Sequence, residues 1–230
     1  MTLAADDWQA LALSLRLALV STLFLLILAT PLAWWLARGS SRWRAIVATL
    51  VAMPLVLPSS VLGFYLLIVL GEGGPIGAWT QALGLGRLPF TFEGLVLASV
   101  VYSLPFVVQP IQGAMEAVGS ASLDAAATLG AGPLDRLVTL VLPMSWPGFV
   151  TAAVLGFAHT LGEFGVVLMM GGSLPGETRV AAVQIYEHVE SLDYDRAHGL
   201  AAWLVGLSFA VLLPVYGWRG RLLGLRGVGT

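Results

Sequence analysis

Long apolar runs alternate with short polar segments along this chain. A helix needs about 20 mostly apolar residues to cross a lipid bilayer. The runs that meet this requirement cover about residues 11–37, 45–70, 94–113, 148–170 and 197–218. We therefore expect an all-α membrane protein in which about five transmembrane helices form one bundle. Residues 1–230 would make a single transmembrane domain, with residues 114–147 as a loop outside the membrane.

The composition supports a membrane protein and excludes several other classes. Hydrophobic residues make up 58% of the 230 residues and charged residues 10%, whereas a soluble domain is about one quarter charged. A net charge of −2 gives no basic surface for a nucleic acid, so we expect no nucleic-acid partner. The chain has no cysteine, which excludes disulfides, iron–sulfur clusters and thiolate zinc sites.

Charged residues outside the apolar runs indicate the orientation. Asp6 and Asp7 precede the first run, where a cleavable signal peptide would carry positive charge, so we expect this span to be retained. Arginine is enriched on the cytoplasmic side of a membrane. One side would hold Arg38, Arg42, Arg44, Arg136, Arg219, Arg221 and Arg226, and the other Arg87, Arg179 and Arg196. We therefore expect the N-terminus outside, and the loop 114–147 and the C-terminus in the cytoplasm.

Prolines interrupt the second and third apolar runs. Pro54 and Pro58 lie in the second, and Pro105 and Pro110 in the third. Each proline removes a backbone hydrogen bond, and the freed carbonyl needs a neighbouring helix or a wet cavity. Any single proline is ordinary in a membrane helix. A cluster in two adjacent spans favours kinked helices that border a pathway.

The fourth run carries two ionisable residues, His159 and Glu163. At a spacing of four residues they would share one face of a helix, and such groups usually point into a bundle or a cavity. A metal-dependent enzyme would need more ligands than this pair, so we expect no metal site. A proton relay is a second interpretation. We favour a structural or gating hydrogen bond between helices, with Glu163 bonded to a neighbouring helix.

The loop 114–147 is too long for a simple connection, because most connections are much shorter. Its alanine run favours a helix that Gly130 ends, Pro133 can open a second helix, and Pro143 would stop it. Two short helices would then meet at a bend on the cytoplasmic face. They either bind another protein or form an interfacial hairpin without a partner.

The same loop resembles the EAA motif of the permeases of ABC importers. The motif reads E-A-A, three residues, Gly, nine residues, then I-x-L-P. This chain matches that spacing with Asp124, Ala125, Ala126, Gly130, Leu140, Leu142 and Pro143. It departs from the motif with Asp in place of Glu and Leu in place of Ile. The resemblance implies a coupling helix that docks in a groove of a cytoplasmic ATPase subunit.

Further segments are similar to the molybdate branch of this family, with the sulfate and thiosulfate permeases as close relatives. The similar segments are 53–65, 156–165, 174–179, and the run through Tyr186 and 192–194. The resemblance implies a multi-pass transport subunit in the bacterial inner membrane that translocates molybdate by alternating access. It could instead carry sulfate, thiosulfate or tungstate. Two further alternatives are an intramembrane enzyme that uses His159 and Glu163, and a gradient-driven carrier.

The resemblance also implies partners. The chain has no lysine and therefore no Walker A motif, so we expect no cofactor in it and ATP and Mg²⁺ on a partner ATPase dimer. A second copy would complete a homodimer, and an extracytoplasmic binding protein would deliver the molybdate. Pathway or gating candidates are Ser59, Ser60, Ser103, His159, Glu163 and Gly165.

A short amphipathic helix is expected on the outer face, over residues 177–190. In this prediction Ala182, Tyr186 and Val189 face the bundle, and Glu187 and Glu190 face the solvent.

Overall fold

The computed structural model describes residues 3–39, 41–84 and 86–222, and the regular structure in this part of the chain is entirely helical. The helices in chain order are α1 (Ala5–Arg38), α2 (Trp43–Ala52), η1 (Met53–Leu55), α3 (Ser59–Leu70), α4 (Pro75–Ala82), α5 (Phe92–Ala117), α6 (Ser120–Thr128), α7 (Pro133–Asp135), η2 (Arg136–Val141), α8 (Leu142–Met144), α9 (Trp146–Leu161), α10 (Gly165–Gly171), α11 (Ala181–Glu190) and α12 (Tyr194–Leu222). Arg226, which contributed to the predicted orientation, lies outside the described residues.

Three helices of the described chain are long and apolar enough to cross a membrane by themselves: α1, α5 and the Tyr194–Leu213 part of α12. Two bent pairs pass the same test together. The chain bends by 114° between Trp43–Leu55 and Ser59–Leu70, and by 68° between Pro133–Met144 and Trp146–Leu161. If each bent pair is one span, the structure has up to 5 spans, the number that the apolar runs predict.

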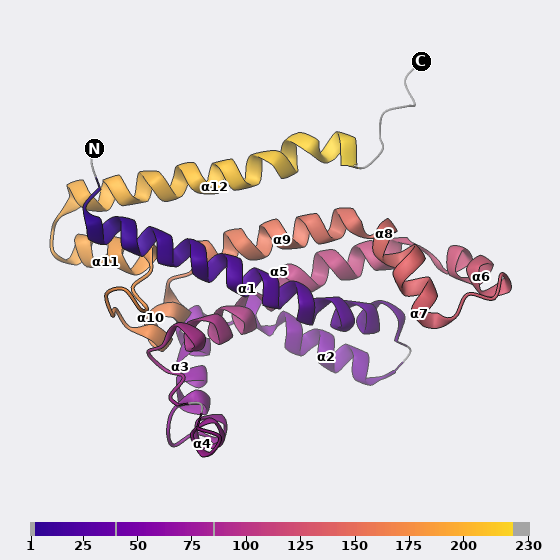
Figure 1. Ribbon diagram of the computed structural model, residues 1–230, viewed down its shortest axis with the longest axis horizontal. Helices are drawn as coiled ribbons and strands as arrows, with labels where there is room; N and C mark the ends of the chain where they lie inside the picture. Colours follow the sequence, from indigo (N-terminus) through magenta and orange to yellow (C-terminus); the bar gives the residue numbers. More distant parts are fainter. Residues whose placement is uncertain (1–2, 40, 85, 223–230) are drawn as a thin grey trace.

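The bend in the second apolar run lies at its two prolines. Helix α2 ends at Ala52, η1 contains Pro54, and Pro58 is the N-cap of α3. The residue before a proline disfavours helical backbone, and proline has no N–H to continue the ladder. Helix α3 therefore departs from the direction of α2 and carries α4 to one side of the bundle (Figure 1).

The fourth run, 148–170, is not one helix, which corrects the sequence prediction. Helix α9 ends at Leu161, and α10 begins only at Gly165. A side chain at Gly165 would collide with the Ser59 Oγ atom, so glycine there lets the start of α10 pack directly on the start of α3. The break places Glu163 in non-helical backbone, which in a membrane must line a cavity or be buried in protein.

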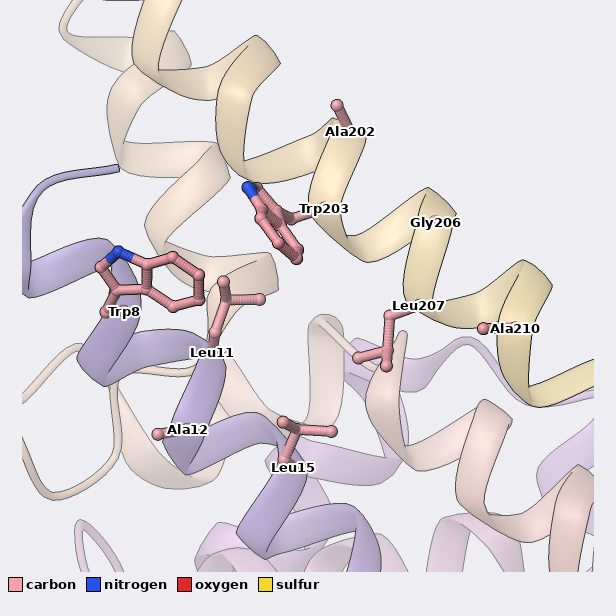
Figure 2. Close-up of a pocket in the computed structure, with 9 residues that line it drawn as sticks. All are labelled: Trp8, Leu11, Ala12, Leu15, Ala202, Trp203, Gly206, Leu207 and Ala210. Atoms are coloured by element: carbon pink, nitrogen blue, oxygen red, sulfur yellow. The ribbon is translucent and has the colours of Figure 1, made fainter. Parts of the chain in front are cut away.

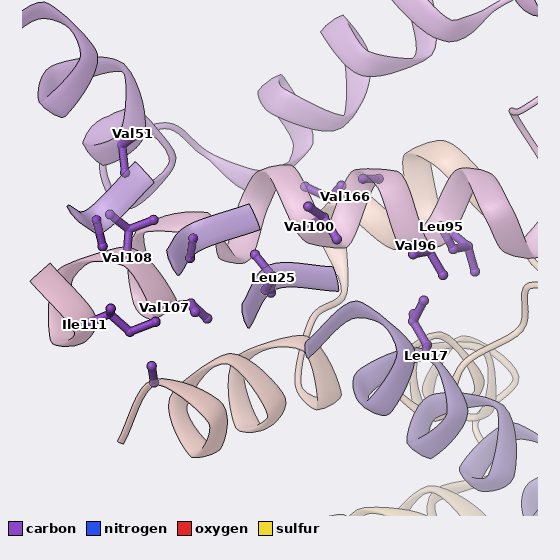
Figure 3. Packing of buried hydrophobic residues seen from close by; sticks show 14 of the residues in the cluster. Leu17, Leu25, Val51, Leu95, Val96, Val100, Val107, Val108, Ile111 and Val166 are labelled. Carbon is purple, nitrogen blue, oxygen red and sulfur yellow. The ribbon is translucent and has the colours of Figure 1, made fainter. Parts of the chain in front are cut away.

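Helices α1, α5 and α9 pack around the hydrophobic core. Buried side chains of α1 and α5, such as Leu17, Leu25, Val107 and Ile111, interdigitate there (Figure 3). On α9, a side chain at Gly156 would lie 2.6 Å from a Val107 methyl carbon. Small residues permit such close approach, which drives helix association where the lipid is as apolar as the protein.

Helix α12 packs less tightly than the other long helices. Only 17% of its most apolar window is buried, against 61% for α5. Between α1 and α12 runs an apolar groove of about 620 Å³ (Figure 2). Trp8 and Trp203 meet edge to face there with ring centroids 5.2 Å apart. Aromatic rings of this kind are typical of the membrane interface.

Candidate functional site

A cavity of about 450 Å³ lies where α9 breaks into α10, and we call it the break cavity. Its lining residues are Ser59, Tyr102, Ala158, His159, Gly162, Glu163, Phe164 and Gly165. The fold therefore brings together four of the candidate pathway residues: Ser59, His159, Glu163 and Gly165. Ser103 does not line the cavity but forms a hydrogen bond with His159, which does. Ser60 is exposed and is not part of the lining.

His159 forms the hydrogen bond between helices that its position predicts. Its Nδ1 atom lies 2.8 Å from the Ser103 Oγ atom on α5, and the same Oγ lies 3.1 Å from the Thr160 Oγ1 atom. The imidazole also stacks on Phe106 with ring centroids 3.8 Å apart, and Tyr102 lies beside it at 4.9 Å. The imidazole is thus fixed in one orientation at the cavity wall.

Glu163 lies near the Ser99 hydroxyl of the neighbouring helix α5, as its predicted role requires, but it forms no hydrogen bond of regular geometry to it. Its side chain is 4% exposed, and neither carboxylate oxygen has a hydrogen-bond partner in the described part of the chain. Helix α9 ends at Leu161, before Glu163, so the prediction that Glu163 shares one helical face with His159 was wrong. A buried polar group without a partner costs stability. Such a residue at membrane depth marks a functional site.

The loop segment that matches the EAA spacing forms two helical arms at the end of the molecule away from the N-terminus (Figure 1). Helix α6 is the first arm, and α7, η2 and α8 form the second. Gly130 joins the arms with a φ of 88°, a left-handed conformation that glycine adopts without strain. Pro143 lies in the last turn of the second arm, which ends one residue later at Met144, so the predicted stop is displaced by a single position.

Most residues of the motif are accessible on these arms. Asp124, Ala125, Gly130 and Pro143 are exposed, and Ala126, Leu140 and Leu142 are half-buried. The loop also displays apolar side chains that the motif does not include: Leu129 is 88% exposed, Leu134 72% and Val138 53%. We call these three residues the loop patch. In the sequence, these three residues could have been found only from their position near the predicted bend between the two short helices.

The opposite end of the molecule is built around α11. This helix begins at Ala181 rather than at Glu177, and it buries Val183, Gln184 and His188. Tyr186 and Val189 are exposed, so the predicted buried face was wrong for them, while Glu190 is exposed as predicted. A 2.6 Å hydrogen bond to Glu190 raises the pKa of Tyr186 above its ordinary value.

The rotation of α11 has a cause that the sequence did not reveal. Asp7 of α1 is fully buried and accepts hydrogen bonds from His188 Nε2 at 2.8 Å and from Arg196 Nη2 at 3.1 Å. The Ser14 Oγ atom accepts the N–H of Ala181 at 2.8 Å. This Asp7 cluster ties the starts of α1 and α12 to α11. Its only signal in the sequence was an acidic residue beside an apolar run.

The described residues contain no group of three or more His, Asp or Glu side chains that could hold a metal ion. Glu163 and His159 line the break cavity with hydroxyl groups around them, and no arginine is among the lining residues. The arrangement offers hydroxyl groups, one imidazole and one carboxylate.

Comparison with known proteins defines the class. The family profile "Binding-protein-dependent transport system inner membrane component" matches residues 29–224. The chain belongs to this family. It is therefore a multi-pass inner-membrane transport subunit of the ABC importer type, whose ATPase is a separate subunit. The interpretations as an enzyme or as a carrier that works alone do not hold.

Individual relatives narrow the comparison. The chain is 57% identical over 225 residues to the molybdenum transport system permease protein ModB of Azotobacter vinelandii, covering 98% of this chain and 100% of that protein. It is 36% identical over 191 residues to ModB of Escherichia coli K12, covering 83% of each. A bacterial ABC transporter that imports alginate has the same fold, with a TM-score of 0.76 at 19% identity over 95% of this chain and 80% of that chain.

Proposed function

We propose that this chain is the transmembrane subunit of an ATP-driven importer that moves molybdate into the cell by alternating access. The observation that carries the proposal is the 57% identity to a molybdenum permease over nearly the whole chain. In this proposal an extracytoplasmic binding protein delivers the anion, and a cytoplasmic ATPase dimer binds ATP and Mg²⁺.

The side chains that line the break cavity support the transport of an oxyanion that is bound only weakly as it passes. Hydroxyl groups of Ser59 and Tyr102 lie at its wall, and Ser103 engages His159 Nδ1, which leaves Nε2 as the ring nitrogen for a ligand. Conduction needs contacts that are strong enough for entry and weak enough for release. Neutral donors meet this requirement better than an arginine, which would hold a doubly charged anion tightly.

The homodimer is part of the proposal. A bundle of up to 5 spans is too small to enclose a pathway with a gate at each end. Most oligomers of one chain have two-fold symmetry, and the same surface then faces itself across the axis. Two break cavities that meet near such an axis would form one path between the membrane faces.

The loop patch is the proposed contact with the ATPase, through the coupling residues from Asp124 to Pro143. Exposed apolar side chains at the tip of a rigid helical bend are typical of a docking surface. The proposed orientation puts this end in the cytoplasm. Since the chain has no cysteine, single cysteines at Leu129 and at Leu192 can test it with a membrane-impermeant maleimide on intact spheroplasts. We expect labelling at position 192 only, and labelling at position 129 alone would reverse the orientation.

Transport itself is tested in proteoliposomes that contain this chain with its ATPase and binding protein. We expect uptake of radioactive molybdate that requires ATP inside the vesicles and the binding protein outside. Unlabelled molybdate should inhibit the uptake of radioactive molybdate much more strongly than the same concentration of sulfate does. Equal or stronger competition by sulfate, thiosulfate or tungstate would assign one of these anions instead. Uptake without the ATPase would contradict the proposal.

A further inference from the structure

A second cavity lies at the other side of the bundle, where α1 ends and α2 begins. Its volume is about 450 Å³, and its lining residues are Gly39, Ser41, Arg42, Arg44, Ala45, Ala48 and Gln112. The first three belong to the connection between the helices, and Gln112 comes from the last turns of α5. We call it the arginine cavity. None of the transport chemistry described above uses it.

The wall of the arginine cavity carries one uncompensated positive charge. Arg44 Nη2 donates to Glu116 Oε1 at 3.0 Å, and Gln112 Nε2 donates to the same oxygen at 2.9 Å. That pair is neutral as a unit. Arg42 forms no ion pair with any acidic residue of the described chain, and its side chain is exposed. A ligand with a single negative charge would balance this wall.

Helix α2 also carries an exposed apolar surface, which begins next to Arg42 at the rim of the cavity. Trp43, Ile46 and Leu50 share one side of α2 and are 59%, 51% and 58% exposed. Trp43 stands at the first turn of the helix, the level at which tryptophan usually marks the membrane interface. Ala45 and Ala48, which also line the cavity, lie on the other side of α2. Arg42 is the lining residue that stands next to the apolar face, because it precedes Ile46 by four residues and Leu50 by eight.

We propose that the arginine cavity binds the phosphodiester of an anionic phospholipid headgroup, with the acyl chains along the apolar face of α2. A phosphodiester carries one negative charge, which matches the single charge of Arg42. The guanidinium group can bind two phosphate oxygens with parallel hydrogen bonds, and the Ser41 hydroxyl and Gln112 amide add neutral donors. A free phosphate or molybdate ion would gain nothing from Trp43, Ile46 and Leu50.

Native mass spectrometry of the purified full-length protein tests the proposal. The probes are phosphatidylglycerol, phosphatidylcholine with the same acyl chains, and glycerol phosphate. We expect phosphatidylglycerol to be retained and to raise the Tm, with phosphatidylcholine and glycerol phosphate much weaker. Arg42→Gln should weaken phosphatidylglycerol binding by about tenfold or more, because both parallel charge-assisted hydrogen bonds to the phosphate are lost. Arg42→Lys should restore part of it.

Arg87→Gln is the matched control, because Arg87 is also an exposed arginine but pairs with Glu72 near the opposite end of α5. It should leave lipid binding unchanged. Equal retention of the two lipids, or equal weakening by both variants, would overturn the proposal. Binding of glycerol phosphate as tight as that of the lipid would assign a free-anion site instead. Added ATPase subunit could instead displace the lipid and protect Arg42 from chemical modification. That result would assign the cavity to a protein interface and would also overturn the proposal.

Discussion

The two ends of this bundle differ in how their side chains are satisfied. At the end that carries α6 to α8, apolar side chains such as Leu129 are exposed, and none of the described residues covers them. At the end that carries α11, a buried carboxylate, an imidazole and a guanidinium satisfy one another through the Asp7 cluster. The first end leaves an apolar surface exposed. At the second end, the Asp7 cluster stabilises the fold by contacts inside the chain. The structure of this end therefore does not depend on a partner protein.

This difference predicts that substitutions at the two ends have different effects. Substitutions at the loop patch should change assembly and leave the fold intact, because the side chains are exposed. Substitutions in the Asp7 cluster should change stability first. Four experiments, ordered from the largest expected effect to the smallest, can break or sharpen the comparison.

Leu129→Arg should reduce co-purification of the ATPase subunit, and ATP-dependent uptake, by more than tenfold. An 88% exposed leucine contributes little to folding, but a charge at a docking surface must be desolvated without a partner. Pull-down and uptake measure the effect, and the Tm of the isolated subunit should stay the same. Leu192→Arg at the opposite end is the control, since Leu192 is 72% exposed and should leave ATPase binding unchanged. Normal ATPase binding by the Leu129 variant would remove the loop patch from the interface.

Asp7→Asn should destabilise the isolated subunit by about 2–3 kcal/mol, since it weakens two charge-assisted hydrogen bonds and leaves His188 and Arg196 without their anion. Thermal or denaturant unfolding in detergent measures this loss. The neighbouring Asp6 is exposed, so Asp6→Asn is a control of equal charge change. If both variants were equally stable, the cluster would not hold this end together.

Glu163→Leu should raise the Tm and lower molybdate uptake severalfold. The carboxylate is buried without a hydrogen-bond partner among the described residues, so an apolar side chain of similar size removes a cost to folding. Loss of uptake would follow if the carboxylate acts on the passing anion or on a gate. Unfolding and uptake are measured on the same preparation, with Ser60→Ala as a control outside the cavity lining. Unchanged uptake would show that Glu163 has no part in transport.

Gly130→Ala should destabilise the bend between the two loop arms by about 1 kcal/mol, because alanine is strained at a φ of 88°. Nothing lies within 4 Å of an added Cβ atom there, so the effect comes from the backbone alone. Gly132→Ala is the matched control, with equally open space and a φ of −70°. Hydrogen exchange of α6 and α7 should rise in the first variant only. Equal exchange in both would mean that the bend does not depend on its left-handed residue.

Local features of the fold could be predicted from the sequence with good success. The apolar runs locate α1, α5 and α12, the prolines at 54 and 58 locate the bend before α3, and the glycine at 130 locates the turn between the loop arms. Each of these depends on residues near one another in the chain. The break at Gly162 escaped prediction, because an apolar run without proline gives no sign that α10 must turn to meet α3.

Long-range polar contacts account for the rest of what the sequence did not reveal. Asp7 and His188 are 181 positions apart, and their 2.8 Å hydrogen bond turns α11 so that Tyr186 faces outward. Ser103 and His159 were both candidates, but nothing in their spacing pairs them. Glu163 was expected to find a partner and has none in the described structure.

The sequence by itself determined that this is a helical membrane protein, which apolar runs contain α1, α5 and α12, and which loop has the spacing of a coupling segment. Hydropathy and turn chemistry act within a few residues, so they can be read along the chain. Only the tertiary structure decided which polar groups meet: the break cavity around His159 and Glu163, and the cluster around Asp7. Such pairings depend on how whole helices are rotated against one another, and that rotation is set by packing across the entire bundle.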